Sequence, residues 1–304
     1  MKKIKDISIC VVILNYQTYL DSIQYVQTLK KQQVSNLKIL IVDNCSPNNS
    51  FGYLDDYFDS DGDVTVIKSQ KNGGYAYGNN YGLHYLENKG FDYIVISNND
   101  IFIDDKLLLS KLANYYDELK DCAFIAPIMW TKGRISMLSA WKIPSFWDDV
   151  VDSLRMTNML FGGNTSYKIS NMANAPVEVD CLSGAFFMGT YDTFKLIGFM
   201  DENTFLYGEE VILAKKVKMA RLRNFIIPSL NYEHQNSGTI STLISSVQAR
   251  KHLTESRVYY HLTYFNGTKL KGMILRGLFT VWKLENYFYC LLKATLTNVM
   301  TKVR

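Results

Sequence analysis

Short apolar runs alternate with segments of helical spacing along the first part of the chain. The runs are rich in Ile and Val and occupy residues 7–14, 37–42, 64–67 and 93–96. The segments of helical spacing that follow them occupy residues 20–31, 51–58, 77–87 and 106–119. Each run is apolar nearly throughout, as expected for a strand whose two faces are both covered by helices. The alternation therefore predicts an α/β fold with a mainly parallel central sheet flanked by helices.

The pattern is less regular after this part. Residues 124–127 and 224–228 are expected to form further strands, and residues 209–222 have the spacing of a helix with a basic outer face. Residues 130–175 show no clear period, which indicates long loops and short elements that could shape a pocket. No internal repeat or Pro-rich linker interrupts the sequence. We therefore expect one continuous domain over most of the chain.

The strand at residues 93–96 is followed by Ser97-Asn98-Asn99-Asp100. In open α/β sheets the ligand crevice lies beyond the carboxyl ends of the strands. A hard divalent cation that is shared with phosphate oxygens needs only one or two protein carboxyl or amide oxygens. This segment therefore indicates metal or phosphate ligands at a sheet edge, and an Asx turn after a strand is the alternative.

Three other polar clusters follow predicted strands. The first is Leu14-Asn15-Tyr16, and the second runs from Asp43 through Asn44 to Ser46, where Asp43 is either a nucleobase acceptor or a turn cap. The third, at residues 71–80, contains adjacent glycines that let the backbone approach a ligand closely. It matches neither GxGxxG nor GxxxxGK[ST], which argues against dinucleotide-binding and P-loop proteins.

Composition and charge are those of a folded protein with an unusual C-terminus. The 304 residues are 47% hydrophobic, and the five cysteines are far apart with no CxxC pair, so neither a disulfide framework nor a zinc site is indicated. The apolar run at the N-terminus lacks the features of a signal peptide, and we expect a cytoplasmic protein. From Arg250 onward the chain has ten Lys and Arg and two Glu, which is a net charge of +8. The whole chain carries +4, so the preceding residues carry −4.

The ordered set of clusters resembles the family 2 glycosyltransferases with the GT-A fold, most closely their rhamnosyltransferase-like branch. The resemblance rests on residues 11–16, 41–46, 72–80 and 98–100, and continues in residues 179–185 and 205–210, so that it covers roughly residues 7–240. It implies an inverting transfer of a sugar from a UDP- or dTDP-linked donor to a growing surface polysaccharide. The implied nucleotide-sugar-binding residues are Leu14, Asn15, Tyr16, Asp43, Asn44, Ser46, Asn72, Gly73, Gly74, Asn79, Asn98, Asn99, Asp100, Gly184 and Ala185.

The resemblance also assigns the chemistry. It implies Glu210 as the general base with Glu209 beside it, although acidic residues are favoured at a helix start by the helix dipole as well. It implies Mg²⁺ or Mn²⁺ held by Asp100 with Asn98 and His234, although a lone His in a loop is often an ordinary polar residue. Two positions depart from the family pattern: Asn98 replaces its first carboxylate, and Ile212 replaces the Asp that often follows the acidic pair.

The last part of the chain is treated as a separate unit, with residues 1–245 as the GT-A domain and residues 246–304 as a basic, aromatic-rich helical extension. Its longest uncharged stretch, residues 286–292, is too short to cross a bilayer. Basic and aromatic residues on a helix suit the plane of an anionic membrane surface. The alternative is a helical pair that packs on the domain or forms a homodimer, and no motif indicates a nucleic-acid interface.

The expected protein is thus a glycosyltransferase at the inner face of the cell membrane that acts on a lipid-linked acceptor. One rival is a catalytically silent member that serves as a binding partner in a glycan-assembly complex, which Asn98 and Ile212 keep open. Another is a sugar-phosphate nucleotidyltransferase, which would need a Gly- and Arg-rich loop after the first strand, where Leu14-Asn15-Tyr16 stands instead. The remaining histidines, His84, His252 and His261, are expected to be structural or surface residues.

Overall fold

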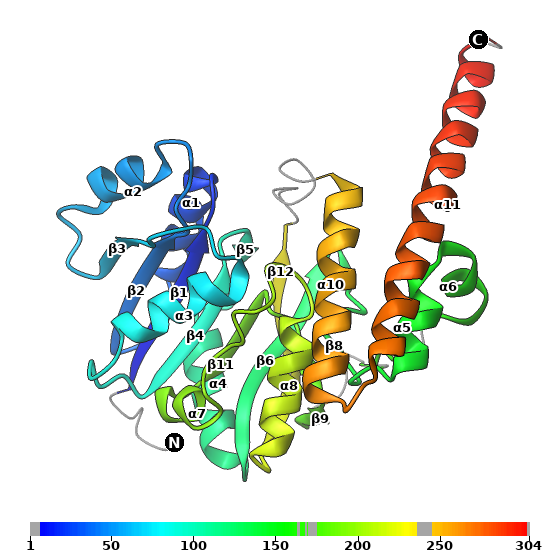
Figure 1. Cartoon of the computed structure of the whole chain (residues 1–304). Coiled ribbons are helices and arrows are strands. Elements are labelled where there is room, and N and C mark those ends of the chain that lie inside the picture. The colour runs from blue at the N-terminus through cyan, green and yellow to red at the C-terminus, as the bar shows by residue number, and fades with distance from the viewer. Residues whose placement is uncertain (1–6, 163–164, 168, 170–174, 236–244, 303–304) are drawn as a thin grey trace.

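The structure is a computed structural model that describes residues 7–162, 165–167, 169, 175–235 and 245–302, with the backbone alone for residues 292–302. A twisted sheet crosses the middle of the molecule, with helices on both of its faces (Figure 1). The last helix, α11, extends beyond the rest of the molecule (Figure 1).

The described residues form a sheet of ten strands, eight of which follow one another in the order β3-β2-β1-β4-β11-β6-β12-β5. These eight are β1 (Ser8–Asn15), β2 (Asn36–Asp43), β3 (Val64–Lys68), β4 (Tyr93–Asn98), β5 (Ile101–Phe102), β6 (Cys122–Thr131), β11 (Phe186–Gly189) and β12 (Arg223–His234). β7 (Arg134–Ile135) pairs with β6, β9 (Val177–Val179) pairs with β12, and β8 (Ala140–Trp141) and β10 (Cys181–Leu182) form a separate pair. β11 is antiparallel to both of its neighbours, whereas β3, β2, β1 and β4 are parallel to one another.

The helices follow the alternation read from the sequence. Those of the first half are α1 (Tyr19–Leu29), α2 (Ser50–Phe58), α3 (Tyr75–Tyr85) and α4 (Leu108–Glu118). Those of the second half are α5 (Phe146–Ser153), α6 (Arg155–Phe161), α7 (Tyr191–Leu196), α8 (Glu209–Met219), α10 (Ser246–Tyr264) and α11 (Lys269–Lys302). The predicted α/β fold with a mainly parallel sheet, flanking helices and C-terminal helices is confirmed.

The two faces of the sheet carry separate cores, and β1 supplies both. Its residues Ile9, Val11 and Ile13 pack with side chains of α1, α2 and α4, whereas Cys10 and Val12 pack with side chains of α3, α7 and α8. Successive side chains of a strand point to opposite faces, so an apolar run without alternation is what a doubly covered strand requires. The sheet edge at the carboxyl ends of β1, β2 and β4 is therefore left as the place where polar residues gather.

The structure differs from the expected elements mainly beyond residue 97. β12 continues past Pro228 to His234, because a shift in its pairing with β6 between Ile227 and Asn231 accommodates the proline. β5 and α7 are short elements that the sequence pattern did not indicate. The extra length of β12 places His234 opposite Ile101, next to the end of β4.

The C-terminal helices pack on the rest of the molecule. Tyr260 of α10 is buried in a cluster with Val211 and Ile212 of α8, and Val258 of α10 is buried with Phe146 of α5 and Leu275 of α11. In the part of the chain that the structure describes, no helix combines the length and apolarity needed to cross a membrane. The division at residues 245 and 246 stays a prediction.

Candidate functional site

The carboxyl ends of β1, β2 and β4 are joined by a buried hydrogen-bond network. The side-chain amide of Asn15 donates to Asp43 at 2.8 Å, and Ser46 donates to both carboxylate oxygens of Asp43, through its backbone N–H at 2.9 Å and its hydroxyl at 2.7 Å. The amide of Asn99 donates to Ser22 and, at 3.4 Å, to Asn15. Asp43 is fully buried in this network, so here it holds the loops in place. A direct contact of Asp43 with a nucleobase stays a prediction.

The glycine pair of the third cluster is required by close packing. Gly74 has a φ of 92°, and a Cβ on it would lie 2.1 Å from the carbonyl oxygen of Phe205. Asn44 donates to Asn72 at 3.1 Å and to the carbonyl of Gly74 at 3.0 Å, which fixes the loop before α3. A Cβ on Gly73 would overlap the ring of Tyr77 in the first turn of α3. This loop thus joins the sheet edge to the segment that leads into α8.

Three other residues implied for binding of the nucleotide-sugar donor, Leu14, Asn79 and Tyr16, are buried or half-buried. A Cβ on Gly78 would lie 2.4 Å from Leu14, so the side chain of Leu14 packs directly against the backbone of α3. Asn79 is buried. Its amide donates to the carbonyl of Tyr75 at 3.0 Å, and its oxygen has no hydrogen-bond partner in the described part of the chain. Tyr16 lies half-buried just beyond the end of β1.

Asp100 and His234 meet at the edge of the sheet. Oδ1 of Asp100 lies 3.0 Å from Nε2 of His234, and both side chains are mostly buried. The contact depends on β12 being long enough to pair with β5, which follows Asp100 directly. Asn98, the last residue of β4, is half-buried two positions before Asp100. A carboxylate and an amide oxygen are ligands that suit Mg²⁺ or Mn²⁺ when phosphate oxygens complete the shell, and here the imidazole of His234 lies beside the carboxylate.

Glu209 and Glu210 begin α8 immediately after two residues with left-handed backbone. Tyr207 has a φ of 69° and Gly208 a φ of 86°. A non-glycine residue in this region costs free energy and is concentrated at functional sites. The turn directs both glutamates inward, so that Glu209 is buried and Glu210 is half-buried. A role confined to the helix dipole would leave the carboxylates in solvent, so this geometry favours a chemical role.

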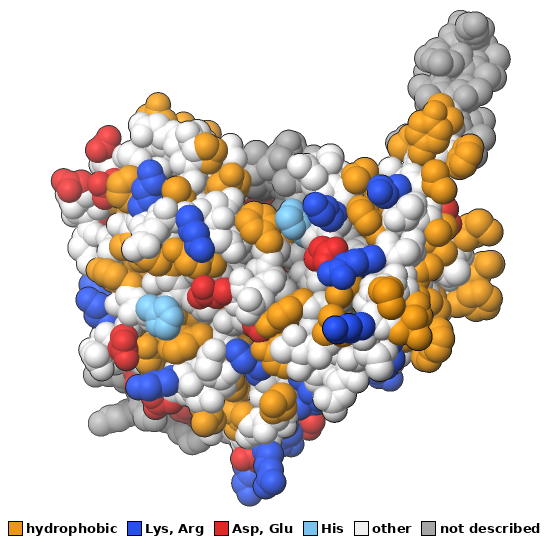
Figure 2. Space-filling view, viewed as in Figure 1, with side chains coloured by type: hydrophobic (Ala, Val, Ile, Leu, Met, Phe, Trp, Pro, Cys, Tyr) orange, Lys and Arg blue, Asp and Glu red, His pale blue; other side chains and the backbone are white. Residues whose placement is uncertain are grey.

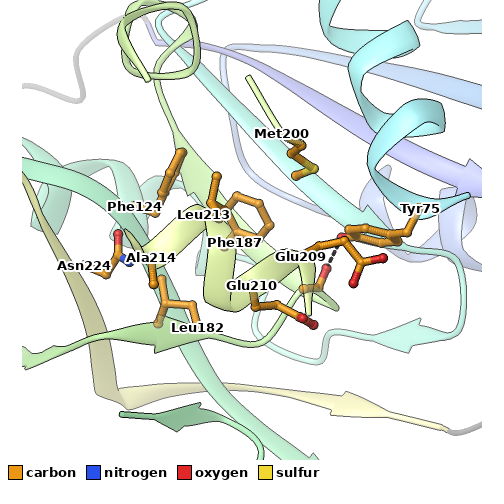
Figure 3. Close-up of a pocket in the computed structure, with 11 residues that line it drawn as sticks. Tyr75, Phe124, Leu182, Phe187, Met200, Glu209, Glu210, Leu213, Ala214 and Asn224 are labelled. Carbon is orange, nitrogen blue, oxygen red and sulfur yellow. Dashed lines mark hydrogen bonds between the residues drawn. The ribbon is translucent and has the colours of Figure 1, made fainter. Parts of the chain in front are cut away.

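The two glutamates line a small cavity of about 10 Å³, room for about one water molecule. Figure 3 shows both carboxyl groups on the side of the cavity where Tyr75 lies, with apolar side chains on the other side. The hydroxyl of Tyr75 donates to the carbonyl oxygen of Gly184. A Cβ on Gly184 would lie 3.0 Å from Oε1 of Glu210, so a larger residue at position 184 would crowd this carboxylate. Ala185 follows, and its carbonyl accepts from the backbone N–H of Asn98 at 2.9 Å.

Burial shifts the acidity of this group of residues. It raises the pKa of Glu209 to about 8, with the charge of Glu210 as the second cause. Burial also raises the pKa of Glu210, and a hydrogen bond from the backbone of Gly184 partly offsets the shift. Among the described residues, Oε1 of Glu209 has no hydrogen-bond partner. The pair therefore holds a proton more firmly than surface glutamates do, as is common for acid–base groups.

Side chains of α10 contact the segment before the glutamates, and the sequence does not predict these contacts. The hydroxyl of Ser256 donates to the carbonyl of Leu206 at 3.4 Å, and the ring of Tyr260 lies 3.6 Å from where a Cβ of Gly208 would be. The rings of Phe205 and His252 are stacked with centroids 4.8 Å apart. These contacts join residues about 50 positions apart in the chain, as the Ser256 bond illustrates. Local sequence signals therefore could not reveal them.

The position of Ile212 has a structural explanation. Ile212 is buried on α8 in the same cluster as Tyr260 and Cys181. An aspartate at this position would place a charge among apolar side chains, at a large cost in free energy. In this chain the position therefore serves the packing of α10 on α8.

Comparison with known proteins identifies the family and the fold. Residues 8–186, more than half of the chain, match the family described as glycosyl transferase family 2. Among solved structures, GalNAc-T7 with UDP, GalNAc and Mn²⁺ is similar with a TM-score of 0.58 and 13% identity, over 84% of this chain and 50% of that chain. The chain thus spans about half the length of that relative. The search of curated proteins returned no match.

Two further structures are similar over more of their own length. TarS of S. aureus in complex with UDP-GlcNAc aligns with a TM-score of 0.55 and 13% identity, over 90% of this chain and 71% of that one. The mannosyltransferase PcManGT from Pyrobaculum calidifontis, in complex with GDP-Man and Mn²⁺, aligns with a TM-score of 0.52 and 11% identity, over 95% and 79%. At these identities the likeness concerns the fold, and it agrees with the GT-A arrangement of the sheet.

Proposed function

The chain belongs to glycosyl transferase family 2, and from this premise we propose that it transfers a sugar from a UDP- or dTDP-linked donor to a glycan acceptor with inversion at the anomeric carbon. The observation that carries the proposal is the glutamate pair of α8, which lies beside Tyr75 and Gly184. Helix packing alone does not explain two adjacent carboxyl groups of which one is buried and the other half-buried. An acid–base reaction does, because it needs a group that holds and releases a proton near neutral pH.

Glu210 is the general base in this proposal. It is the more exposed of the two glutamates, and its carboxylate lines the cavity next to Gly184. As the acceptor oxygen forms its bond to the anomeric carbon, the hydroxyl proton passes to Glu210 and the bond from that carbon to the nucleoside diphosphate breaks. Glu209 lies behind it and stays protonated through most of the neutral range, which keeps a second negative charge from forming next to the base.

The donor diphosphate lies at the sheet edge, near Asp100 and His234. Their direct contact and partial burial fit a divalent cation, with Asn98 able to add an amide oxygen. Bound there, Mg²⁺ or Mn²⁺ would offset the negative charge that develops on the leaving diphosphate. The asparagine network at the ends of β1, β2 and β4 holds these loops in the geometry that the diphosphate needs.

The nature of donor and acceptor is a finer part of the proposal. GalNAc-T7 and TarS were crystallised with UDP or UDP-GlcNAc, which supports a uridine or thymidine nucleotide, whereas PcManGT was crystallised with GDP-Man. A rhamnosyltransferase-like specificity and a lipid-linked acceptor of a surface polysaccharide rest on the sequence resemblance. The C-terminal extension would bring the enzyme to the inner face of the cell membrane, where such an acceptor lies.

Release of nucleoside diphosphate tests the proposal. The full chain is incubated with a panel of UDP- and dTDP-sugars, with Mn²⁺ or with EDTA, and free UDP or dTDP is measured. We expect release from at least one donor, dependent on the cation. Binding of donors without release or transfer would favour the catalytically silent alternative. Release of pyrophosphate from a nucleoside triphosphate and a sugar phosphate would favour a nucleotidyltransferase.

A further inference from the structure

The short helix α6 exposes every one of its large apolar side chains. Met156, Met159, Leu160 and Phe161 are between 62% and 80% exposed, and no residue of α6 is buried. A helix in a globular protein normally buries such side chains, and contiguous exposed apolar surface marks an interaction site. α6 therefore exposes apolar surface with nothing in the described chain packed over it.

α6 is fixed against α11. The carboxylate of Glu285 on α11 accepts from the backbone N–H of Arg155 at 2.8 Å and of Met156 at 3.3 Å. The guanidinium of Arg155 donates to Asn286 at 2.8 Å and lies 4.4 Å from the ring centroid of Tyr289. Figure 1 shows α6 beside α11, and Figure 2 shows hydrophobic side chains gathered at this side of the molecule.

α11 continues the apolar surface along its length. Helical spacing places one stripe of exposed residues on it, formed by Leu270, Met273, Val281, Leu284, Phe288 and Leu291. The same spacing places Lys269, Arg276 and Lys283 along one flank of the stripe. α6, with Arg155 at its start, lies toward the other flank. We call the exposed apolar residues of α6 and of this stripe the α6–α11 face.

Much of the positive charge of the C-terminus is not available to a partner. Arg257 pairs with Asp149 and Asp152, Arg250 lies 3.7 Å from Asp152, and Arg276 pairs with Glu255 at 2.7 Å. The structure thus places much of this charge within the fold of α5 and α10. Apolar contacts must carry the larger share of any binding by this surface.

We propose that the α6–α11 face inserts into an anionic membrane surface. The membrane contact would bring the enzyme to a lipid-linked acceptor, and only this purpose rests on the proposed function. An apolar stripe flanked by cations suits acyl chains below and anionic headgroups at the rim. A second copy of the chain fits worse, because a two-fold interface would set the same basic flanks against each other. The carboxylates nearby, Glu285 and Glu255, are already engaged, by the start of α6 and by Arg276 respectively.

Vesicle flotation of the full chain tests the proposal, with vesicles of phosphatidylcholine alone or in equal parts with phosphatidylglycerol. The variant Met159→Asn with Phe161→Asn removes two exposed apolar side chains from the face. The matched control is Leu196→Asn with Met219→Asn, whose side chains are 67% and 68% exposed on other helices. We expect the α6 variant to lose at least about tenfold in partition to anionic vesicles and the control to bind as the parent does.

Four results would overturn the proposal. They are no vesicle binding by the parent, equal binding of parent and α6 variant, equal loss in the control, and a dimer of the parent in sedimentation velocity that the α6 substitutions dissociate while vesicle binding persists. A thermal-shift measurement with UDP and Mn²⁺ separates the two levels of inference. Unchanged nucleotide binding with no vesicle binding by the parent sinks the membrane proposal alone. Intact vesicle binding without any nucleotide response sinks the proposed function alone.

Discussion

Replacing Glu209 by glutamine should change how stability depends on pH. Burial raises the pKa of this carboxyl from 4.5 to about 8. Between these values the folded state keeps the proton, whereas the unfolded state releases it near pH 4.5. The folded state therefore binds more protons in this window, and the free energy of unfolding falls as pH rises from about 4.5 to about 8, with no further loss above.

The size of the effect follows from the same shift. Each unit of pKa corresponds to about 1.4 kcal/mol, so the full shift would cost at most roughly 5 kcal/mol at pH 8. The protonation of Glu209 depends on that of Glu210, so we expect the free-energy cost at pH 8 to be about half of this upper bound. A glutamine at position 209 stays neutral at every pH. Its unfolding free energy should therefore match the parent near pH 4.5 and exceed it by about 2–3 kcal/mol near pH 8.

Urea unfolding followed by circular dichroism across this pH range measures the difference. The control is Glu118→Gln, because Glu118 is exposed at the end of α4. Parallel pH profiles for the parent and Glu209→Gln would refute the assignment of a proton to the pair. So would a control that gains as much stability near pH 8 as the Glu209 variant does.

Two further substitutions test the chemistry and the packing. Glu210→Gln should keep donor affinity while transfer falls about 10²–10⁴-fold in a radiolabelled-donor assay, because proton removal is lost; full activity in Glu210→Gln with loss in Glu209→Gln would reverse the two roles. Gly74→Ala should lower stability in urea by about 3 kcal/mol or more through its clash with Phe205, whereas Gly90→Ala, with a φ of 75° and open space around it, should cost about 1 kcal/mol. Equal losses of stability in the two glycine variants would show that backbone strain alone, without the clash with Phe205, sets the cost of the substitution.

The sheet and its first helices could be predicted because their signals are local. An unbroken apolar run such as residues 93–96 requires cover on both faces, and the structure places it in the middle of the sheet as β4. β12 was predicted too short because Pro228 normally ends a central strand. The bulge that accommodates it depends on pairing with β6, which the sequence of β12 does not encode by itself.

The sequence predicts a set of candidate residues, and how they are arranged depends on tertiary contacts. Asp100 and His234 are 134 positions apart, and only the pairing of β12 with β5 brings them into contact. The oxygens of Asp43 accept from Asn15 and Ser46, which fits the turn-cap alternative, and a contact of Asp43 with a nucleobase stays a prediction. The support of the Gly208 turn by α10 depends on tertiary contacts, and no local pattern signals them.

Calorimetric titration of UDP and dTDP in the presence of Mn²⁺ tests the central claim most directly. The parent is compared with Asp100→Ala and with the matched control Asp104→Ala, since Asp104 is exposed just beyond the same sheet edge. The account predicts binding by the parent and by Asp104→Ala that EDTA abolishes, and loss of metal-dependent binding in Asp100→Ala. Binding by Asp100→Ala equal to the parent, with the same response to EDTA, would contradict it.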